Sequence, residues 1–521
     1  MAIALVAGAP VLATAQSRSN VPLKNWGGFA VFRDAVYDDL ERLVTAGLAD
    51  RTLLNTKPLS RMEAARIVAR AIDRIRNDRE GVYNNRRDLE PVLDRLMEEF
   101  ASELRGAGVA VTGTTAEPPS LVSFLPIDRG MAYVGYANRD LSPVNGQGRR
   151  FQDGFNGGAT FESRLQIGDV LTFYLQPEAL ANEEYGALRL AAGYVKLTLF
   201  NVELLVGRDS LWWGPGLHGS LILSNNAPPL DQVRIGSAEP FLLPWVGDWM
   251  GPMKILFFLA QLEENRHHPR AKLAGMRASI AAFSFLELGA SRTVMFGGDT
   301  RPRLSLDEYW RPLLDPPAGD DTARFRSNNL FAIDADLRIP NVTRVLPVSD
   351  MRLYGEFGWD DTCCNSNFIP LQDAISVLLG VHLFGVFGRE GLDARTEYAR
   401  SSRLSYRHSQ FRTGYQTRGE VIAHYMGTEG EDFYSRVTHR FHPDVMIGLE
   451  VNRSKVGLTT PTPVAPKERT IAGALDLSYR FLDVYTVFAQ YRLAWVENRN
   501  FRPNADGWDN LFRVEVTRSF R

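Results

Sequence analysis

Apolar and polar side chains alternate along most of the second, longer part of the chain. The alternation is clearest in residues 331–339, 351–359, 445–452, 475–481 and 512–520. Successive side chains of a β-strand point to opposite faces, so each segment has one apolar face and one polar, often charged face. The segments are about ten residues long and often end in aromatic residues, which favours tilted membrane-spanning strands over a soluble sandwich.

These segments predict an all-β transmembrane barrel of antiparallel strands. We expect strands near 129–138, 157–167, 169–177, 187–199, 202–208, 251–264, 269–281, 283–295, 329–339, 350–359, 374–384, 391–400, 430–440, 443–453, 469–481, 483–495 and 509–520. Tight and long connections alternate, and an even strand number returns both termini to the same side of the membrane. One further crossing is therefore required between residues 209 and 250, and the alternation within 217–225 makes it the best candidate. The total is about 18 strands, which is wide enough for an aqueous lumen.

The part of the sequence before the predicted barrel has the spacing of apolar residues that is typical of α-helices. Apolar residues recur at helical spacing in 36–44, 64–75 and 89–100, and Ser60 and Glu63 form a capping box before the second of these segments. A small α-helical domain is therefore expected before the barrel, and we place it in the periplasm.

The domain boundaries follow from these periods. We assign 1–15 to the remnant of a secretory signal peptide, 16–105 to the helical periplasmic domain, 106–127 to a linker and 128–521 to the outer-membrane barrel. The basic residues that usually begin a signal peptide are missing, so its true start is left open, with an ordinary chain end as the alternative.

The composition and motifs of the chain argue against several classes of function. The chain has 521 residues and a net charge of -2, which gives no electrostatic pull toward nucleic acid. It has no apolar run of about 18 residues that could form a membrane-spanning helix. Cys363 and Cys364 are adjacent, and whether they are bonded or free is left open. We find no catalytic motif, and the pairs His267–His268 and His439–His442 lack a third ligand, so we expect no enzyme activity, no cofactor and no metal.

Three sequence blocks carry a family resemblance. Residues 207–229 contain Trp-Trp-Gly-Pro followed by Ser-Asn-Asn-Ala-Pro, residues 354–361 read Tyr-Gly-Glu-Phe-Gly-Trp-Asp-Asp, and residues 424–434 read His-Tyr-Met-Gly-Thr-Glu-Gly-Glu-Asp-Phe-Tyr. In this order they resemble the capsule-assembly Wzi family. The resemblance implies an 18-stranded outer-membrane barrel with a helical periplasmic part. It also implies a lectin-like role in holding capsular polysaccharide at the cell surface.

The helical part has a weaker resemblance of its own. Residues 37–40, 46–48 and 59–64 are similar to a surface-layer homology module, a family that binds cell-wall polymers. This resemblance would make peptidoglycan a partner. The alternative is a helical cap over the periplasmic mouth of the barrel.

The first block also supplies the candidate site. A sugar site combines aromatic faces with planar polar groups. The candidate residues for polysaccharide binding are Arg208, Asp209, Trp212, Trp213, Asn225 and Asn226. The alternative is that the two tryptophans belong to a structural plug or a membrane anchor. Secondary candidates are the loop arginines Arg403, Arg407, Arg412 and Arg418, which could pair with an acidic polysaccharide.

We therefore expect a monomeric outer-membrane barrel that contacts lipid and binds capsular or other extracellular polysaccharide. Two other functions are kept open. The first is a diffusion porin, for which the lumen must conduct. The second is a barrel tethered to the cell wall through its helical domain. The identity of the sugar does not follow from the sequence.

Overall fold

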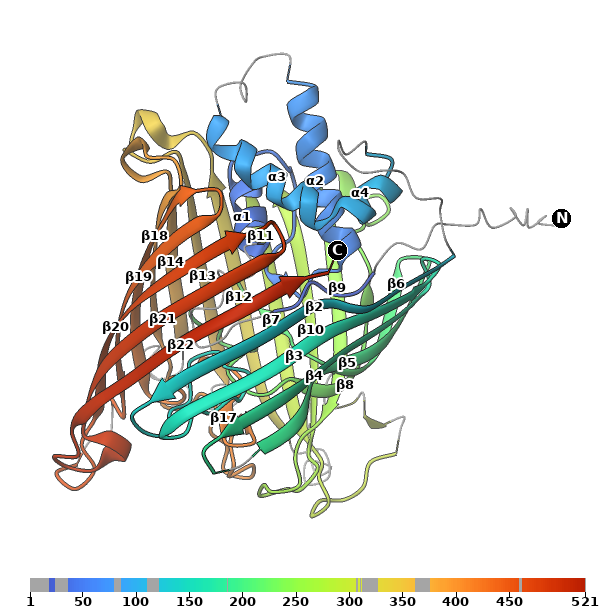
Figure 1. Ribbon diagram of the computed structural model, residues 1–521. Coiled ribbons are helices and arrows are strands. Elements are labelled where there is room, and N and C mark those ends of the chain that lie inside the picture. The colour runs from blue at the N-terminus through green and yellow to red at the C-terminus, as the bar shows by residue number, and fades with distance from the viewer. Residues whose placement is uncertain are drawn as a thin grey trace, which may run out of the picture.

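The computed structural model describes residues 18–23, 36–78, 86–109, 121–184, 186–305, 308–309, 311, 327–360, 375–458 and 462–520. Eighteen antiparallel strands form a closed barrel (Figure 1). They are β2 (Val122–Ala137), β3 (Gly154–Ile167), β4 (Leu171–Asn182), β5 (Gly186–Leu199), β6 (Val202–Asp209), β8 (Leu230–Ser237), β9 (Met253–Gln261), β10 (Lys272–Phe283), β11 (Leu286–Phe296), β12 (Ser327–Ile339), β13 (Asp350–Asp360), β14 (Ile375–Phe384), β15 (Leu392–Arg400), β18 (Gly430–His442), β19 (Val445–Val456), β20 (Glu468–Phe481), β21 (Tyr485–Glu497) and β22 (Gly507–Ser519).

Each barrel strand pairs with its neighbours in chain order, and the first and last strands close the ring. In the closing pair, β2 runs antiparallel to β22, with Tyr133 opposite Glu515. The connections at one end are mostly short, with residues 238–252 between β8 and β9 as the longest, and the helices cover this end, which we call the helical end (Figure 1). The connections at the other end include the long segment 401–429, and we call it the long-loop end. The expected fold class of an 18-stranded transmembrane barrel after a few helices is confirmed.

One expected crossing was placed wrongly. The extra strand between residues 209 and 250 is β8, whereas 217–225 lies inside the barrel and forms no wall strand. The alternation in 217–225 was misleading because Leu221, Ile222 and Leu223 are all buried in succession. In β8 the alternation does correspond to a wall strand, since Val233 and Ile235 face outward while Gln232 and Arg234 are buried.

Two boundaries also differ from the expectation. Strand β2 begins at Val122, inside the expected linker, because the chain reaches the sheet before the alternation becomes regular. Strand β18 extends to His442, so its tight turn lies at residues 443–444. The expected signal peptide, residues 110–120 of the expected linker and the Cys363–Cys364 pair lie outside the described residues.

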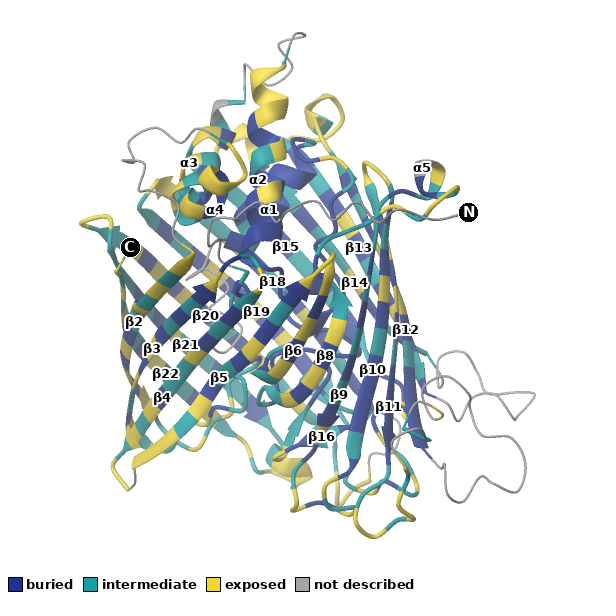
Figure 2. Ribbon diagram, turned by 90° about the vertical axis from the view of Figure 1, so that its right-hand side faces the viewer, coloured by how far each residue is buried: buried dark blue, intermediate teal, exposed yellow. Residues whose placement is uncertain are grey.

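The two faces of the wall differ as the alternation requires. On β20, Leu475 and Leu477 are 56% and 42% exposed on the outer face, whereas Asp476 between them is 1% exposed and faces the lumen. Figure 2 shows the same alternation of buried and exposed positions along the strands. Lumenal charges are paired, as for Asp476 with Arg436 at 2.7 Å. This ion pair links β18 and β20 across the intervening strand β19.

The helical domain lies over the helical end of the barrel (Figures 1 and 2). It contains α1 (Val36–Thr45), α2 (Arg61–Arg76), α3 (Glu90–Glu99) and α4 (Ala101–Gly106). Ser60 caps α2 by accepting a hydrogen bond from the backbone N–H of Glu63 at 3.0 Å, as expected from the capping box. The Glu63 side chain instead pairs with Lys254 on β9 at 2.6 Å, which ties α2 to the wall.

The remaining elements are short. They are the two-residue strands β1 (Thr56–Lys57), β7 (Trp212–Trp213), β16 (Gln416–Thr417) and β17 (Glu420–Val421), the helix α5 (Gly247–Met250) and the 3-10 turns Arg87–Leu89, Val342–Arg344, Val386–Gly388 and Arg499–Phe501. None of the helices in the described part of the chain is long and apolar enough to cross a membrane.

Candidate functional site

The segment between β6 and β8 folds into the lumen, and we call residues 210–229 the plug. Its strand β7 pairs with β1 from the helical domain, so that Thr56 lies opposite Trp213 and Lys57 opposite Trp212. The plug then turns back on itself, and the backbone N–H of Trp213 donates to the carbonyl of Leu223 at 3.1 Å. A segment of the helical domain and a segment of the barrel thus form one small sheet inside the lumen.

The two tryptophans of the plug are buried. Trp212 is 2% exposed and Trp213 is 0% exposed, and the Trp213 ring packs edge-on against Phe258 of β9. The close packing needs glycine, because a Cβ added at Gly219 would lie 2.1 Å from the His424 ring. Their burial gives these tryptophans no exposed face for a sugar ring and agrees with the plug alternative for this segment.

The other residues of the first candidate site fall into two places. Asn225 donates to the carbonyl of Leu23 at 3.2 Å and Asn226 donates to that of Val421 at 3.1 Å, so both fasten the plug to neighbouring segments. Asp209 is also buried and accepts from Arg234 at 3.1 Å. Arg208 lies apart from them and makes a two-point ion pair with the exposed Asp231 on the next strand.

Carboxylates of the barrel wall bind the backbone of the inserted segments. Glu287 on β11 accepts from the N–H groups of Leu54 and Asn55, at 2.8 and 3.0 Å. Glu356 on β13 accepts from the N–H of Leu221 at 3.0 Å. A buried N–H group without a partner would be costly, so each of these acceptors stabilises the inserted backbone. These contacts hold the inserted segments in fixed positions.

A third wall carboxylate does the same at the turn of the plug. Glu397 on β15 accepts from the N–H groups of Leu217 and His218, at 2.7 and 2.9 Å. The Tyr354 hydroxyl donates to Glu397 Oε1 at 2.6 Å and orients it. Three carboxylates on three different strands therefore hold the lumenal segments, and their role could not be read from strand alternation alone.

The three sequence blocks of the family resemblance meet at the plug. Glu356 of the second block holds the first block through Leu221. In the third block, the ring of Tyr434 stacks on His218 with centroids 4.1 Å apart, and His424 packs against Gly219. Burial lowers the pKa of His424 to about 3, so its imidazole is neutral at physiological pH. Residues of all three blocks thus pack against one another inside the lumen and help to fill it.

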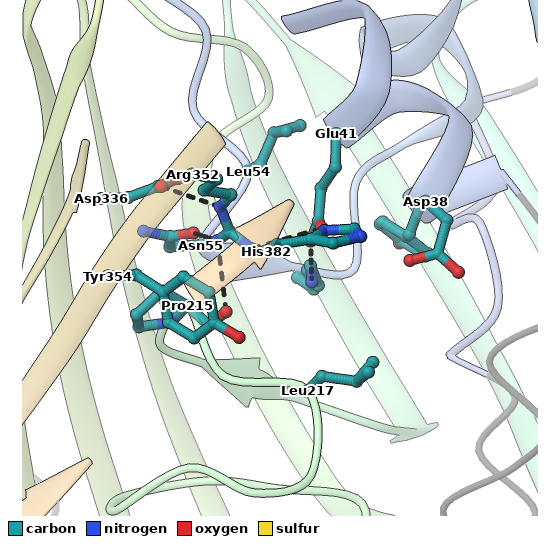
Figure 3. Close-up of polar contacts among 12 residues, drawn as sticks. Asp38, Glu41, Leu54, Asn55, Pro215, Leu217, Asp336, Arg352, Tyr354 and His382 are labelled. Atoms are coloured by element: carbon teal, nitrogen blue, oxygen red, sulfur yellow. Dashed lines mark hydrogen bonds and ion pairs between the residues drawn. The ribbon is translucent and has the colours of Figure 1, made fainter. Parts of the chain in front are cut away.

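Arg352 connects the helical domain, the plug and the wall (Figure 3). Its Nε donates to Asp336 of β12 at 2.7 Å. Its Nη2 donates to Asn55 at 3.3 Å and to the plug carbonyl of Pro215 at 3.2 Å. Its Nη1 lies 3.2 Å from Glu41 Oε2 on α1. One guanidinium group therefore contacts three parts of the molecule that are far apart in sequence.

The connection between β15 and β18, residues 401–429, completes the filling from the long-loop end. Its inner residues Tyr406, Phe411, Tyr415 and Ile422 are buried in one apolar cluster with Trp213 and Leu223 of the plug and Phe258 of the wall. The Tyr406 hydroxyl donates to the carbonyl of Leu221 at 2.9 Å. Plug and connection together make a packed interior in the barrel.

The outer face of the same connection carries the secondary candidates. Arg403, Arg407, Arg412 and Arg418 are all exposed. Among the described residues, Arg407 lies 3.8 Å from Glu429, and we find no carboxylate within 4 Å of the other three. The structure therefore brings these four arginines to one end of the barrel, on a segment whose inner face is anchored by packing.

The histidines have structural partners. His268 bonds to Thr300 at 2.6 Å and to the carbonyl of Gln410 at 2.9 Å. His439 packs against Phe441. Within the described residues, no group of three or more His, Cys, Asp or Glu side chains is arranged to hold a metal ion.

Comparisons with known proteins agree with this architecture. The family model of the capsule assembly protein Wzi matches residues 135–510. An uncharacterised 55.8 kDa protein in the cps region of Klebsiella pneumoniae is 25% identical over 368 residues, which cover 70% of this chain and 62% of that relative. The structure of Escherichia coli Wzi, described as a carbohydrate-binding β-barrel involved in group 1 capsule assembly, matches with a TM-score of 0.68 and 19% identity over 94% of this chain and 98% of that one. Because the family model spans most of the chain, this protein belongs to the capsule assembly protein Wzi family.

Proposed function

We propose that this protein is a lectin-like outer-membrane barrel that binds capsular or other extracellular polysaccharide and anchors it at the cell surface. The observation that carries the proposal is the difference between the inner and outer faces of residues 401–429. Their inner face packs into the lumen, while their outer face presents four exposed arginines. Family membership and the described carbohydrate binding of Escherichia coli Wzi support the same function.

In this proposal the long-loop end faces the extracellular side and the helical domain lies in the periplasm. Short turns of outer-membrane barrels ordinarily face the periplasm and long loops face outward. The helices lie at the end with the short turns (Figure 1). Since the strands of one chain close the ring, the barrel needs no second copy to complete it, and we propose a monomer.

The chemistry of the arginines favours an acidic polymer. A guanidinium group can bind a carboxylate through two parallel N–H···O bonds, and this geometry is more specific than a point charge. Four such groups on one surface allow several weak contacts along one chain, and linked contacts raise the overall affinity. Such binding requires no catalytic step, and we propose that the protein is not an enzyme.

The porin alternative requires an open lumen. Trp213, Leu223 and Tyr415 instead pack together inside this barrel, and the helical domain covers its other end. The cell-wall tether remains a prediction. Its alternative, a cap over the barrel, is supported by ion pairs such as Lys254–Glu63 that fasten the helices to the wall.

Binding of the purified, detergent-solubilised full chain to an array of bacterial polysaccharides tests the proposal. We expect selective binding to acidic polysaccharides, weakened by added salt because exposed charges are screened. Binding to neutral glycans alone, or no glycan binding by folded protein, would contradict it.

A further inference from the structure

A cavity lined by several charged residues lies at the opposite end of the barrel from the exposed arginines. It has a volume of about 410 Å³ and lies between helices α1 and α3 on one side and the wall strands β14, β15, β18 and β19 on the other. Its inner end reaches Leu217 at the turn of the plug. The volume falls within the range of about 300–1,000 Å³ that is typical of small-molecule sites.

Most of the charges that line this cavity are paired, and among the described charged lining residues only Arg440 and the exposed Glu390 make no ion pair. Asp39 pairs with Arg95 at 2.6 Å, and Asp88 pairs with Arg42 at 2.6 Å. Arg440 on β18 points into the same cavity, but no carboxylate in the described part of the chain lies within 4 Å of it. Its guanidinium donates to the carbonyl of Pro443 at 3.3 Å and approaches the Met446 sulfur at 3.7 Å.

A matching acceptor faces the cavity from α1. Asp38 Oδ1 lies 3.5 Å from Arg395, but Asp38 Oδ2 is buried without a hydrogen-bond partner. Buried polar atoms are nearly always satisfied, and because the Asp38 side chain is 20% exposed, rotation of its carboxyl group can turn this oxygen toward a donor from a ligand. Val92 of α3 and Met446 of β19 add apolar lining. The cavity therefore offers a cation for an anionic group, an acceptor for a hydroxyl group and an apolar wall.

We infer that this cavity is a binding site for an acidic monosaccharide, a pyranose with one carboxylate such as a hexuronate. Its carboxylate would pair with Arg440, one of its hydroxyl groups would donate to Asp38 Oδ2, and its C–H face would lie against the apolar lining. A neutral hexose would leave Arg440 without an anion. The site is separate from the long-loop surface of the proposed function and does not depend on it.

Saturation-transfer NMR titrations of the full chain in detergent test this inference with D-galacturonate, D-galactose and inorganic phosphate as probes. We expect saturable galacturonate binding that is at least about tenfold weaker in Arg440→Met, the loss of one charge-assisted contact. Arg480→Met is the matched control, because Arg480 lies on the same rim but pairs with Asp444 and Glu98 outside the cavity. This control should bind galacturonate like the parent.

Other results would overturn the inference. Equal binding of galactose, phosphate binding as tight as galacturonate binding, or unchanged affinity in a folded Arg440→Met each contradict an acidic-sugar site. Loss of galacturonate binding on substitution of the four long-loop arginines would assign it to that surface instead. If Arg440→Met does not fold, hydrogen exchange of the parent decides: galacturonate should slow exchange in residues 438–444 while galactose does not, and no difference between them overturns the site.

Discussion

The Arg352 guanidinium group on β13 lies 3.2 Å from the Glu41 carboxylate on α1, and both side chains are buried. Arg395 on β15 contacts the same carboxylate at 2.6 Å. Two wall arginines thus converge on one helix residue inside the mouth of the barrel, and Figure 3 shows Glu41 together with the first of them, Arg352. Since a buried charge is stable only when it is paired, this contact makes the position of α1 depend on the wall.

Arg352→Met should therefore loosen the helical domain. Breaking a buried ion pair by removing one partner typically costs about 3–5 kcal/mol, because the other charge stays buried. Hydrogen exchange of the α1 amides should speed up accordingly. The control Arg480→Met removes a pair with Glu98 on α3 that is more exposed, for which about 0–1 kcal/mol is expected. Equal acceleration in the two variants would contradict the role of Arg352.

The same contact predicts a pH dependence. Burial alone would raise the pKa of the Glu41 carboxyl, but Arg352 and Arg395 hold that pKa well below its usual value of 4.5. Because the folded pKa is the lower one, ionised Glu41 stabilises the docked helix above pH 4.5, and this contribution is lost as the pH falls further. Exchange of the α1 amides measured across this range should show less acid sensitivity in Glu41→Gln than in the parent. An identical pH profile for the two proteins would count against it.

The wall carboxylates predict how the plug can be loosened. Glu356→Gln combined with Glu397→Gln keeps the shapes of the side chains but replaces one oxygen of each carboxyl group by an amide NH2 group, which cannot accept from the N–H groups of the plug turn. The parent should give very low conductance in planar bilayers, and the double variant should show larger and fluctuating currents. Large, steady currents in the parent would instead support the porin alternative.

The register of the wall makes a further prediction. Leu475 lies near the middle of β20 and is 56% exposed on the outer face. Leu475→Arg should destabilise the barrel by about 2–4 kcal/mol if that face meets lipid, as charges near the bilayer midplane do. Leu475→Ala controls for the lost side chain. Urea unfolding followed by heat-modifiable gel mobility compares them, and equal stability of the two variants would refute the lipid-facing register.

Strand alternation predicted the wall well because it reports local geometry. Leu475, Asp476 and Leu477 face outward, inward and outward as expected, since each strand repeats the same two-residue period. The helices were predicted for the same reason, and the Ser60 cap is a contact between residues only three positions apart.

The interior was harder to predict because its contacts are long-range. Nothing near Glu287 in the sequence indicates that it binds the backbone of Leu54 and Asn55, more than two hundred residues away. The false crossing at 217–225 has the same origin, since a plug packed on all sides buries consecutive residues. Trp212 and Trp213 have the composition of a sugar site, but only the fold reveals that they are enclosed.

The most direct test of the central claim is the amount of polysaccharide that cells retain at their surface. Substitution of Arg403, Arg407, Arg412 and Arg418 by Gln removes the charges, and substitution of the same four by Lys keeps them. With equal amounts of folded barrel, we predict that the Gln variant sheds polysaccharide into the medium, that the Lys variant retains an intermediate amount and that Arg480→Met retains as much as the parent. Retention by the folded Gln variant equal to that of the parent would contradict polysaccharide anchoring by this surface.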